Sequence, residues 1–389
     1  MGVIWSVVLG VQILFVLVVM KRLSSARSRI PALVSLDPDL NRNKNVTIVI
    51  PTLNERLRLP ACLEGLRSQN GVDEIIVVDS RSRDGTPEYV QEIQKDYPHK
   101  LTLLTDAELP KGWVGKQWAL QTGFLNSAPT AEWILGIDAD TIPQNGLVTS
   151  LVQTATAEKF DVVSLSPKFI LQTIGEQWLQ PALLVTLIFR FGAVGDSKQF
   201  SKERVMANGQ CFLIRRSVLE KLQGYELAKF SFSDDVTLAR AAAQRGAKVG
   251  FLDGSHLIKV RMYTSMAETW TEWGRSLDLK DSAKPIQTLF NFLVLLATQA
   301  LPIPLLSSLT IWFMFFDFKS NIIINTLFWF NIFVVFLRFL LVIGIRKSYT
   351  DVGLAFWFSP FADPFAVLRI LLSTLSRPQK WRGRIYLKT

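Results

Sequence analysis

The chain has 389 residues, of which 49% are hydrophobic, and its formal net charge is +10. A chain of this length holds two soluble domains or one domain together with membrane segments, and the hydrophobic content favours the second arrangement. The charge does not indicate a nucleic-acid partner, because basic residues cluster beside apolar segments at 21–29, 346–347 and 377–388, where they suit anionic lipid headgroups.

The first element expected is a membrane anchor. Residues 2–20 carry no charge and are about long enough to cross a hydrocarbon core. Basic residues begin after this run, at Lys21 and Arg22, whereas a secretory signal peptide carries its positive charges first. Under the positive-inside rule, residues 1–22 therefore form an uncleaved anchor and the following domain faces the cytoplasm. A helix buried in a soluble core is the alternative.

Residues 45–280 alternate between apolar runs of strand length and helical segments of about ten residues or more. Strands are expected at 46–50, 74–79, 101–105, 133–137 and 162–165, and helices at 55–70, 86–97, 116–126 and 145–158. Such alternation predicts an α/β fold with a mostly parallel sheet flanked by helices. Apolar residues in 171–191 then recur at helical spacing, which fits either a core helix or a helix at the bilayer surface.

The last third returns to membrane character. Residues 287–345 contain two long apolar runs separated by the polar stretch 317–321, which predicts a hairpin of two crossings. Pro302 and Pro304 should kink the first crossing. Residues 346–389 are expected to form an interfacial or re-entrant segment and a basic tail, because a further crossing would carry that tail to the outside.

Polar residues after the first two strands predict a pocket for a nucleotide base. Pro51 ends the first strand, and Asn54 and Glu55 lie in the turn that follows. Asp79 ends the second strand, and open α/β sheets bind ligands outside the carboxyl ends of their strands. A carboxylate there can accept a hydrogen bond from a base ring N–H. The alternative is that Asp79 caps the following helix.

Two further carboxylates, Asp138 and Asp140, follow the fourth strand and share one side of an extended segment. Such oxygen ligands suit Mg²⁺ or Mn²⁺, which would bridge a diphosphate and neutralise the leaving group. Lys116 lies in the glycine-bearing run 110–118, opens the helix that follows the loop of this run, and is placed to reach a phosphate at the helix N-terminus. Trp113 of that run is a candidate to stack on a sugar or lipid.

A third acidic group, Asp234 and Asp235, opens another helix. Ser233 or Asp234 can cap that helix while the other acid favours its dipole, or one of the two carboxylates can act as the general base that removes a proton from an acceptor hydroxyl. The two interpretations are compatible, because a helix end holds a base rigidly. Gly209 and Gln210 enter a strand-like segment and are expected on the acceptor side.

Together, these motifs over residues 46–277 resemble family 2 glycosyltransferases, which have the GT-A fold. The resemblance implies a nucleotide-diphospho-sugar donor, hexosyl or deoxyhexosyl transfer, and inversion at the anomeric carbon. By position, Asp79 resembles the family's base-contacting aspartate, and Asp138 and Asp140 resemble its metal motif. Asp235 resembles the catalytic base, within an Asp-Asp pair where the family carries Glu-Asp.

Processive synthases of this family carry Gln-x-x-Arg-Trp on a membrane-proximal helix. The corresponding stretch here lacks that motif, although Trp273 and Arg275 remain candidates beside the acceptor. The runs 112–118 (GWVGKQW) and 381–386 (WRGRIY), with the apolar hairpin, resemble hopanoid-associated and bacterial carotenoid 2′-O-glycosyltransferases. That resemblance implies transfer of a single sugar to a hydroxyl of a carotenoid or hopanoid-like lipid in the membrane.

Two other functions are weighed against this one. A polysaccharide synthase is disfavoured by the missing motif and by too few crossings for a translocation channel. A catalytically silent membrane scaffold of the same fold is disfavoured by the aspartates at 79, 138, 140 and 235. The expected partners are therefore a nucleotide-diphospho-sugar, a lipid acceptor and the bilayer, with no nucleic acid.

Overall fold

The computed structural model describes residues 2–24, 29–36, 45–195, 202–273, 277, 279, 283–315, 322–375, 380–381 and 384–385. The chain divides into two compact units. The helical unit comprises Met1–Arg27, Leu171–Ala193 and Tyr263–Pro378. The α/β unit comprises Ser28–Ile170, Val194–Met262 and Gln379–Thr389.

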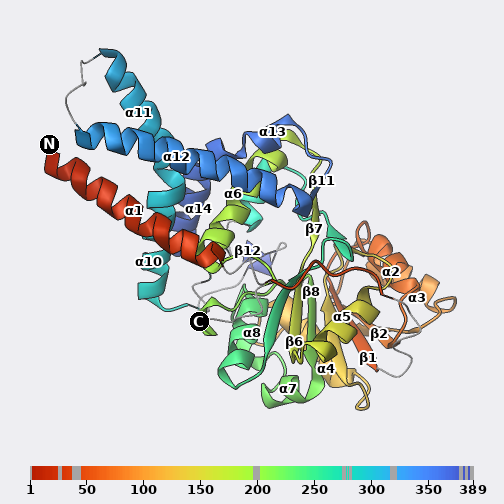
Figure 1. Cartoon of the computed structure of the whole chain (residues 1–389). Helices are drawn as coiled ribbons and strands as arrows, with labels where there is room; N and C mark the ends of the chain where they lie inside the picture. Colours follow the sequence, from red (N-terminus) through yellow and green to blue (C-terminus); the bar gives the residue numbers. More distant parts are fainter. Residues whose placement is uncertain are drawn as a thin grey trace. The chain divides into compact units, whose positions relative to one another are not determined.

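A seven-stranded sheet forms the centre of the α/β unit, with strand order β3-β2-β1-β4-β8-β6-β9 (Figure 1). Its strands are β1 (Val46–Thr52), β2 (Val72–Asp79), β3 (Lys100–Thr105), β4 (Trp133–Ile137), β6 (Val162–Ser166), β8 (Cys211–Arg215) and β9 (Val249–Asp253). Strands β3, β2, β1 and β4 are parallel to one another, β8 is antiparallel to β4 and β6, and β6 is parallel to β9. The predicted sheet is confirmed, with β8 as its reversed strand.

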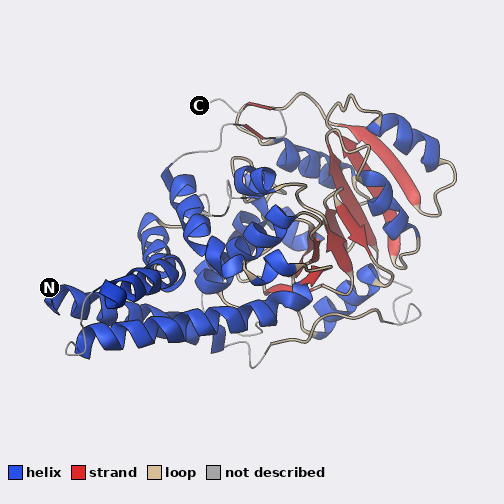
Figure 2. Cartoon of the chain, turned by 90° about the horizontal axis from the view of Figure 1, so that it is seen from above, coloured by secondary structure: helices blue, strands red, loops and turns tan. Residues whose placement is uncertain are grey.

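Helices lie on both sides of this sheet (Figure 2). They are α2 (Leu59–Arg67), α3 (Thr86–Gln94), α4 (Gly115–Asn126), α5 (Leu147–Ala157), α7 (Arg216–Lys221) and α8 (Asp234–Gln244). Helix α2 is shorter than the predicted 55–70, because Asn54 has a positive φ of 57° and Pro60 fixes the first turn.

Short elements complete the α/β unit. The three-residue strand β10 (Ile258–Val260) pairs antiparallel with β5 (Thr141–Pro143) and parallel with β7 (Lys168–Ile170). The turns η3 (Lys202–Arg204) and η4 (Glu226–Ala228) are 3₁₀ helices, and β12 (Lys380–Trp381) pairs with β13 (Arg384–Ile385).

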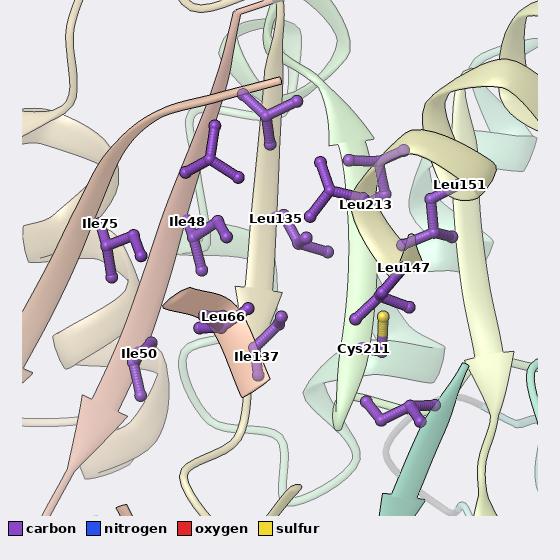
Figure 3. Close-up of a cluster of buried hydrophobic side chains, with 14 of the residues drawn as sticks. Ile48, Ile50, Leu66, Ile75, Leu135, Ile137, Leu147, Leu151, Cys211 and Leu213 are labelled. Atoms are coloured by element: carbon purple, nitrogen blue, oxygen red, sulfur yellow. The ribbon is translucent and has the colours of Figure 1, made fainter. Parts of the chain in front are cut away.

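Each face of the sheet carries its own hydrophobic cluster, because successive side chains of a strand point to opposite faces. On one face, Ile48, Leu135 and Leu213 of β1, β4 and β8 meet Leu66 of α2 and Leu147 of α5 (Figure 3). Helices α4, α7 and α8 supply apolar residues to the cluster on the other face. Burial on both faces explains why the strands read as continuous apolar runs.

The order of the strands places a switch point beside β1. The chain continues from β1 to β2 and β3 on one side and returns to β4 on the other side. In open α/β sheets, ligands bind outside the carboxyl ends of the strands at such a point. The relevant ends here are Thr52 of β1 and the residues that follow β4, beginning with Asp138.

The helical unit contains the apolar segments. Its larger helices are α1 (Gly2–Ser24), α6 (Ile174–Phe191), α10 (Pro285–Leu295), α11 (Pro302–Phe315), α12 (Ile322–Ile345) and α14 (Asp363–Leu375). Its shorter elements are α9 (Met266–Glu268), η5 (Thr269–Trp273), η6 (Leu296–Ala300), η7 (Arg346–Ser348), β11 (Tyr349–Thr350), α13 (Leu354–Trp357) and η8 (Ser359–Ala362).

Two helices among the described residues are long and apolar enough to cross a membrane, Gly2–Ser24 and Ile322–Ser348. A third crossing is available if Pro285–Ala300 and Pro302–Phe315, which meet at 44°, act as one bent span. The bend falls where Pro302 was expected to kink the helix. The predicted polar stretch 317–321 lies outside the described residues.

Helix α6 is a core helix of its unit. A capping box between Thr173 and Glu176 fixes its start, and Leu179 and Leu183 are buried. It packs against α1, α10 and α14. Of the two interpretations of residues 171–191, the structure therefore supports the core helix.

A buried ion pair joins α12 to α14 inside the helical unit. The Arg338 guanidinium donates to both carboxylate oxygens of Asp363, at 2.7 and 2.9 Å, and Gln299 donates to the same carboxylate at 3.0 Å. Residues 353–375 form α13, η8 and α14 in place of one continuous helix. The interfacial or re-entrant assignment of this segment remains a prediction.

Candidate functional site

Lys116 lies within electrostatic reach of four carboxylates, those of Asp138, Asp140, Asp234 and Asp235 (the acidic group). It is the second residue of α4, and its Nζ donates to the two carboxylate oxygens of Asp138, at 2.7 and 2.8 Å. Burial alone would lower the pKa of Lys116, but the charges of Asp138, Asp234 and Asp235 outweigh it and raise the pKa above its ordinary value. The ammonium therefore stays charged. It contacts Asp138, which follows β4, and interacts electrostatically with Asp234 and Asp235, which begin α8.

Two backbone N–H groups hold Asp235. Gly209 donates to its Oδ2 at 2.7 Å, and Val236 donates to its Oδ1 at 2.8 Å. A Cβ on Gly209 would lie only 2.9 Å from the Lys116 Nζ, so the glycine leaves room for the lysine. Burial and the charge of Asp234 raise the pKa of Asp235 to about 7. Asp235 therefore combines a fixed orientation with a pKa suited to proton transfer near neutral pH.

Asp140 faces electrostatic repulsion from Asp138. Burial and the Asp138 charge raise the pKa of Asp140 to about 7, although Arg58 opposes the shift. No cluster of three or more candidate protein ligands occurs within the described residues. Two carboxylates nevertheless fit Mg²⁺, which proteins commonly bind through one or two carboxylates together with substrate phosphates. The donor set thus suits a divalent cation that arrives with a diphosphate.

The Asp79 carboxylate is almost fully buried at the end of β2. Its Oδ1 accepts from the hydroxyls of Thr52 (3.2 Å) and Ser82 (2.6 Å), and its Oδ2 accepts from the Ser82 backbone N–H (2.9 Å). Helix α3 begins at Thr86 with Gly85 at the N-cap position, so Asp79 does not cap that helix. Asp79 instead fixes the loop after β2, and its contact with a base remains a prediction.

The other residues predicted for the base pocket shape the same edge of the sheet. Pro51 lies within β1, and the Asn54 backbone N–H donates to the Ser82 hydroxyl at 2.7 Å. The Glu55 side chain is 2% exposed and lies 3.5 Å from the Arg58 guanidinium. Ser82 was missed by the sequence analysis. The sequence feature that could have indicated Ser82 is the polar run between the end of β2 and the start of α3. Ser82 connects this run to the loop after β1 through its hydrogen bonds with Asp79 and Asn54.

Trp113 is packed in the core of the α/β unit. Its side chain is 8% exposed, and its ring meets Trp118 edge-on with centroids 5.1 Å apart. The next residue, Val114, donates to the Lys229 carbonyl at 2.8 Å, which fastens this loop to the segment that leads into α8. Trp113 therefore packs within the α/β unit, and its stacking on a ligand remains a prediction.

The remaining acceptor-side residues are distributed over both units. Gln210 is mostly buried, and its carbonyl accepts from the Asp138 N–H at 3.3 Å, which places it next to the acidic group. Trp273 belongs to the helical unit, where its ring lies 6.4 Å from that of Tyr263. Arg275 lies outside the described residues. The acceptor-side roles remain predictions.

Comparisons with known proteins find similarity to glycosyltransferases. Residues 47–223 match the protein family described as Glycosyl transferase family 2. The 4,4'-diaponeurosporenoate glycosyltransferase of Staphylococcus haemolyticus is 25% identical over 235 residues, 59% of this chain and 60% of the relative. The "Probable glycosyltransferase YdaM" of Bacillus subtilis is 26% identical over 241 residues, 59% of this chain and 53% of the relative.

A solved structure supports the fold. The mannosyltransferase from Pyrobaculum calidifontis, in complex with GDP-Man and Mn²⁺, matches with a TM-score of 0.56 and 18% identity over 96% of both chains. At that identity the likeness concerns the fold alone. The alignments span 60% and 53% of the length of the two curated relatives. Residues 47–223 are thus similar to family 2 glycosyltransferases, and they lie on a mixed sheet flanked by helices of the GT-A type.

Proposed function

We propose that this family 2 glycosyltransferase transfers one sugar, with inversion, from a nucleotide-diphospho-sugar to a hydroxyl of a membrane lipid. The observation that carries the proposal is the arrangement around Lys116. Its ammonium contacts Asp138 directly and lies within electrostatic reach of Asp235, at the carboxyl edge of the sheet. Donor-side and acceptor-side carboxylates thereby meet at the place where this type of sheet binds ligands.

On the donor side, Asp79 offers a buried carboxylate to the base, and the loops tied by Ser82 form the edge of the base pocket. Asp138 and Asp140 would hold Mg²⁺ or Mn²⁺ together with the donor diphosphate. A divalent cation at this place supplies positive charge that offsets the charge on the leaving diphosphate.

On the acceptor side, Asp235 takes the proton of the attacking hydroxyl. Its two backbone hydrogen bonds orient the carboxylate, and a pKa of about 7 leaves a large ionised fraction at neutral pH. The oxygen of the hydroxyl then forms the new bond to the anomeric carbon, while the bond to the diphosphate breaks. One base suffices for this single displacement, which inverts the anomeric centre.

The membrane supplies the acceptor in this proposal. Helices α1 and α12 are long and apolar enough to anchor the chain, and basic residues lie at the C-terminal end of each, at Arg22 in the last turn of α1 and at Arg346 after α12. The positive-inside rule then places the catalytic domain in the cytoplasm. The relative named for 4,4'-diaponeurosporenoate supports a carotenoid acceptor, and a hopanoid-like lipid is the second choice within the same class.

Lipid extracts of cells with and without the gene test this function. Mass spectrometry of carotenoid and hopanoid fractions should show one glycoside, carrying a single sugar, that is lost with the gene. Cells that carry Asp235→Asn should match the deletion. Identical lipid glycosides in all strains, or the loss of a long polysaccharide, would contradict the proposed acceptor and the single transfer.

A further inference from the structure

The ion pair between Lys116 and Asp138 has a consequence for how the donor and the metal bind. We propose that Lys116 competes with the divalent cation for Asp138, and that the donor diphosphate draws Lys116 away so that donor and cation bind together. This inference rests on the proposed function, because it takes Asp138 and a metal–diphosphate pair as parts of the donor site.

The geometry makes the two cations competitors for one carboxylate. Lys116 Nζ lies 2.7 and 2.8 Å from the two oxygens of Asp138, whose side chain remains 24% exposed. Mg²⁺ binds oxygen ligands at about 2.0–2.1 Å and would have to approach one of these oxygens. A cation at that distance would sit against the ammonium, and like charges so close repel strongly in a partly buried site.

Lys116 has a restricted choice of other positions. Its side chain is 14% exposed, and the space toward Gly209 is too small for a single added methyl group, since a Cβ there would lie 2.9 Å from Nζ. The charges of Asp234 and Asp235 also attract it. These neighbours keep Lys116 within the acidic group even when its ammonium moves away from Asp138. A bound diphosphate would then give the ammonium a new anionic partner.

The charge of the site explains why donor and cation should arrive together. Four carboxylates, Asp138, Asp140, Asp234 and Asp235, lie within electrostatic reach of Lys116, and Arg58 also acts on Asp140. A cation alone must displace Lys116 and meets its repulsion. A diphosphate that contacts Lys116 removes this obstacle, and the cation then offsets the charge of both the phosphates and Asp138. By linkage, each ligand raises the affinity for the other to the same degree.

The test measures Mn²⁺ binding to the purified full-length chain in detergent by the electron paramagnetic resonance signal of free Mn²⁺. Without nucleotide, Lys116→Met should bind Mn²⁺ about tenfold more tightly than the wild type, because the competing charge is gone. Addition of UDP or GDP should raise Mn²⁺ affinity less in Lys116→Met than in the wild type. Lys116→Arg, which keeps the charge, should bind Mn²⁺ weakly without nucleotide.

Arg58→Met is the matched control, because Arg58 acts on Asp140 through its charge and pairs with Glu55. This variant should gain less than about threefold in Mn²⁺ affinity, since Arg58 contacts Glu55, whereas Lys116 contacts Asp138 directly. An equal gain in both variants would show a general charge effect and would overturn the competition. Unchanged or weaker binding in Lys116→Met would also overturn it.

A different result would contradict the proposed function itself. If neither the wild type nor any variant binds Mn²⁺, with or without nucleotide, the metal assignment of the donor site is wrong and the competition falls with it. Thermal unfolding of each variant checks the fold. Lys116→Gln provides a second neutral variant with the same expected gain, so the test does not depend on the folding of Lys116→Met.

Discussion

Replacement of the proposed base is the most direct test of the chemistry. Asp235→Asn keeps the size of the side chain and removes its capacity to take a proton. General-base catalysis contributes about 10² to 10⁴ in rate, so kcat should fall by that factor, which corresponds to roughly 3 to 5 kcal/mol in the activation free energy. Donor affinity should change little, because Asp235 belongs to the acceptor side.

The structure also sets the cost of this replacement for the fold. The two carboxylate oxygens of Asp235 accept from Gly209 and Val236 at 2.7 and 2.8 Å, and an amide has only one oxygen to offer. One of the two hydrogen bonds is therefore lost, at a cost of about 1–3 kcal/mol. Release of nucleotide diphosphate measures turnover, calorimetry with UDP or GDP measures donor binding, and thermal unfolding separates the stability effect.

The pH dependence of turnover gives an independent signature. Because the pKa of Asp235 is raised to about 7, turnover should fall as pH decreases through 7 and the base becomes protonated. The Asp234 charge is the second cause of this shift, so Asp234→Asn should move the acid limb of the profile to lower pH while turnover persists. A fall of less than tenfold in Asp235→Asn, or an acid limb unmoved in Asp234→Asn, would refute the assignment of the base.

Three further predictions address the donor site, the glycine beside the base and the membrane helices. Asp140→Ala should weaken metal-dependent donor binding, measured by calorimetry with Mn²⁺, and full activity in chelator would contradict the metal assignment. Gly209→Ala should lower kcat about 10-fold to 100-fold with little change in melting temperature, because its Cβ, 2.9 Å from the Lys116 Nζ, displaces a flexible side-chain end. Arg338→Met should destabilise the chain by about 3–5 kcal/mol in thermal unfolding in detergent, and Arg338→Met with Asp363→Leu should restore much of the loss, whereas equal loss in both would argue against the ion pair.

Much of the fold could be predicted from local patterns. Strands β1, β2, β4 and β6 read as apolar runs because the sheet is covered on both faces, and α12 was bounded correctly by its flanking polar residues. The strands β5, β7 and β10 were missed, since three residues are too few to show a period. Their pairing is set by contacts far apart in sequence, between residues 141–143, 168–170 and 258–260.

The sequence pointed to the acids of the candidate site, whose roles remain predictions, and it did not give their contacts. Carboxylates at strand and helix ends indicate a site because their positions follow from the fold. The contact between Lys116 and Asp138 could not be predicted from the positions of strand and helix ends. The helix N-terminus suggested a phosphate, whereas the folded chain places Lys116 against Asp138, 22 residues away, because α4 begins beside the end of β4. Trp113 shows the same limit, since an aromatic residue in a loop can be packed or presented, and only the fold decides.

The position of Gly209 links these observations into one account of the acidic group. Its N–H orients the proposed base, its missing side chain makes room for Lys116, and Lys116 in turn holds the acid that follows β4. A change at Gly209 or Lys116 should therefore affect both halves of the reaction, even though the halves come from different stretches of the chain. Effects of paired substitutions within this group should be non-additive, because the residues share one set of contacts.

A double variant of Gly209→Ala and Lys116→Met should lose little more activity than Lys116→Met alone, since the Cβ then meets no ammonium. Additive losses would mean that Gly209 acts on Asp235 alone and that the lysine has no part in holding the base side together.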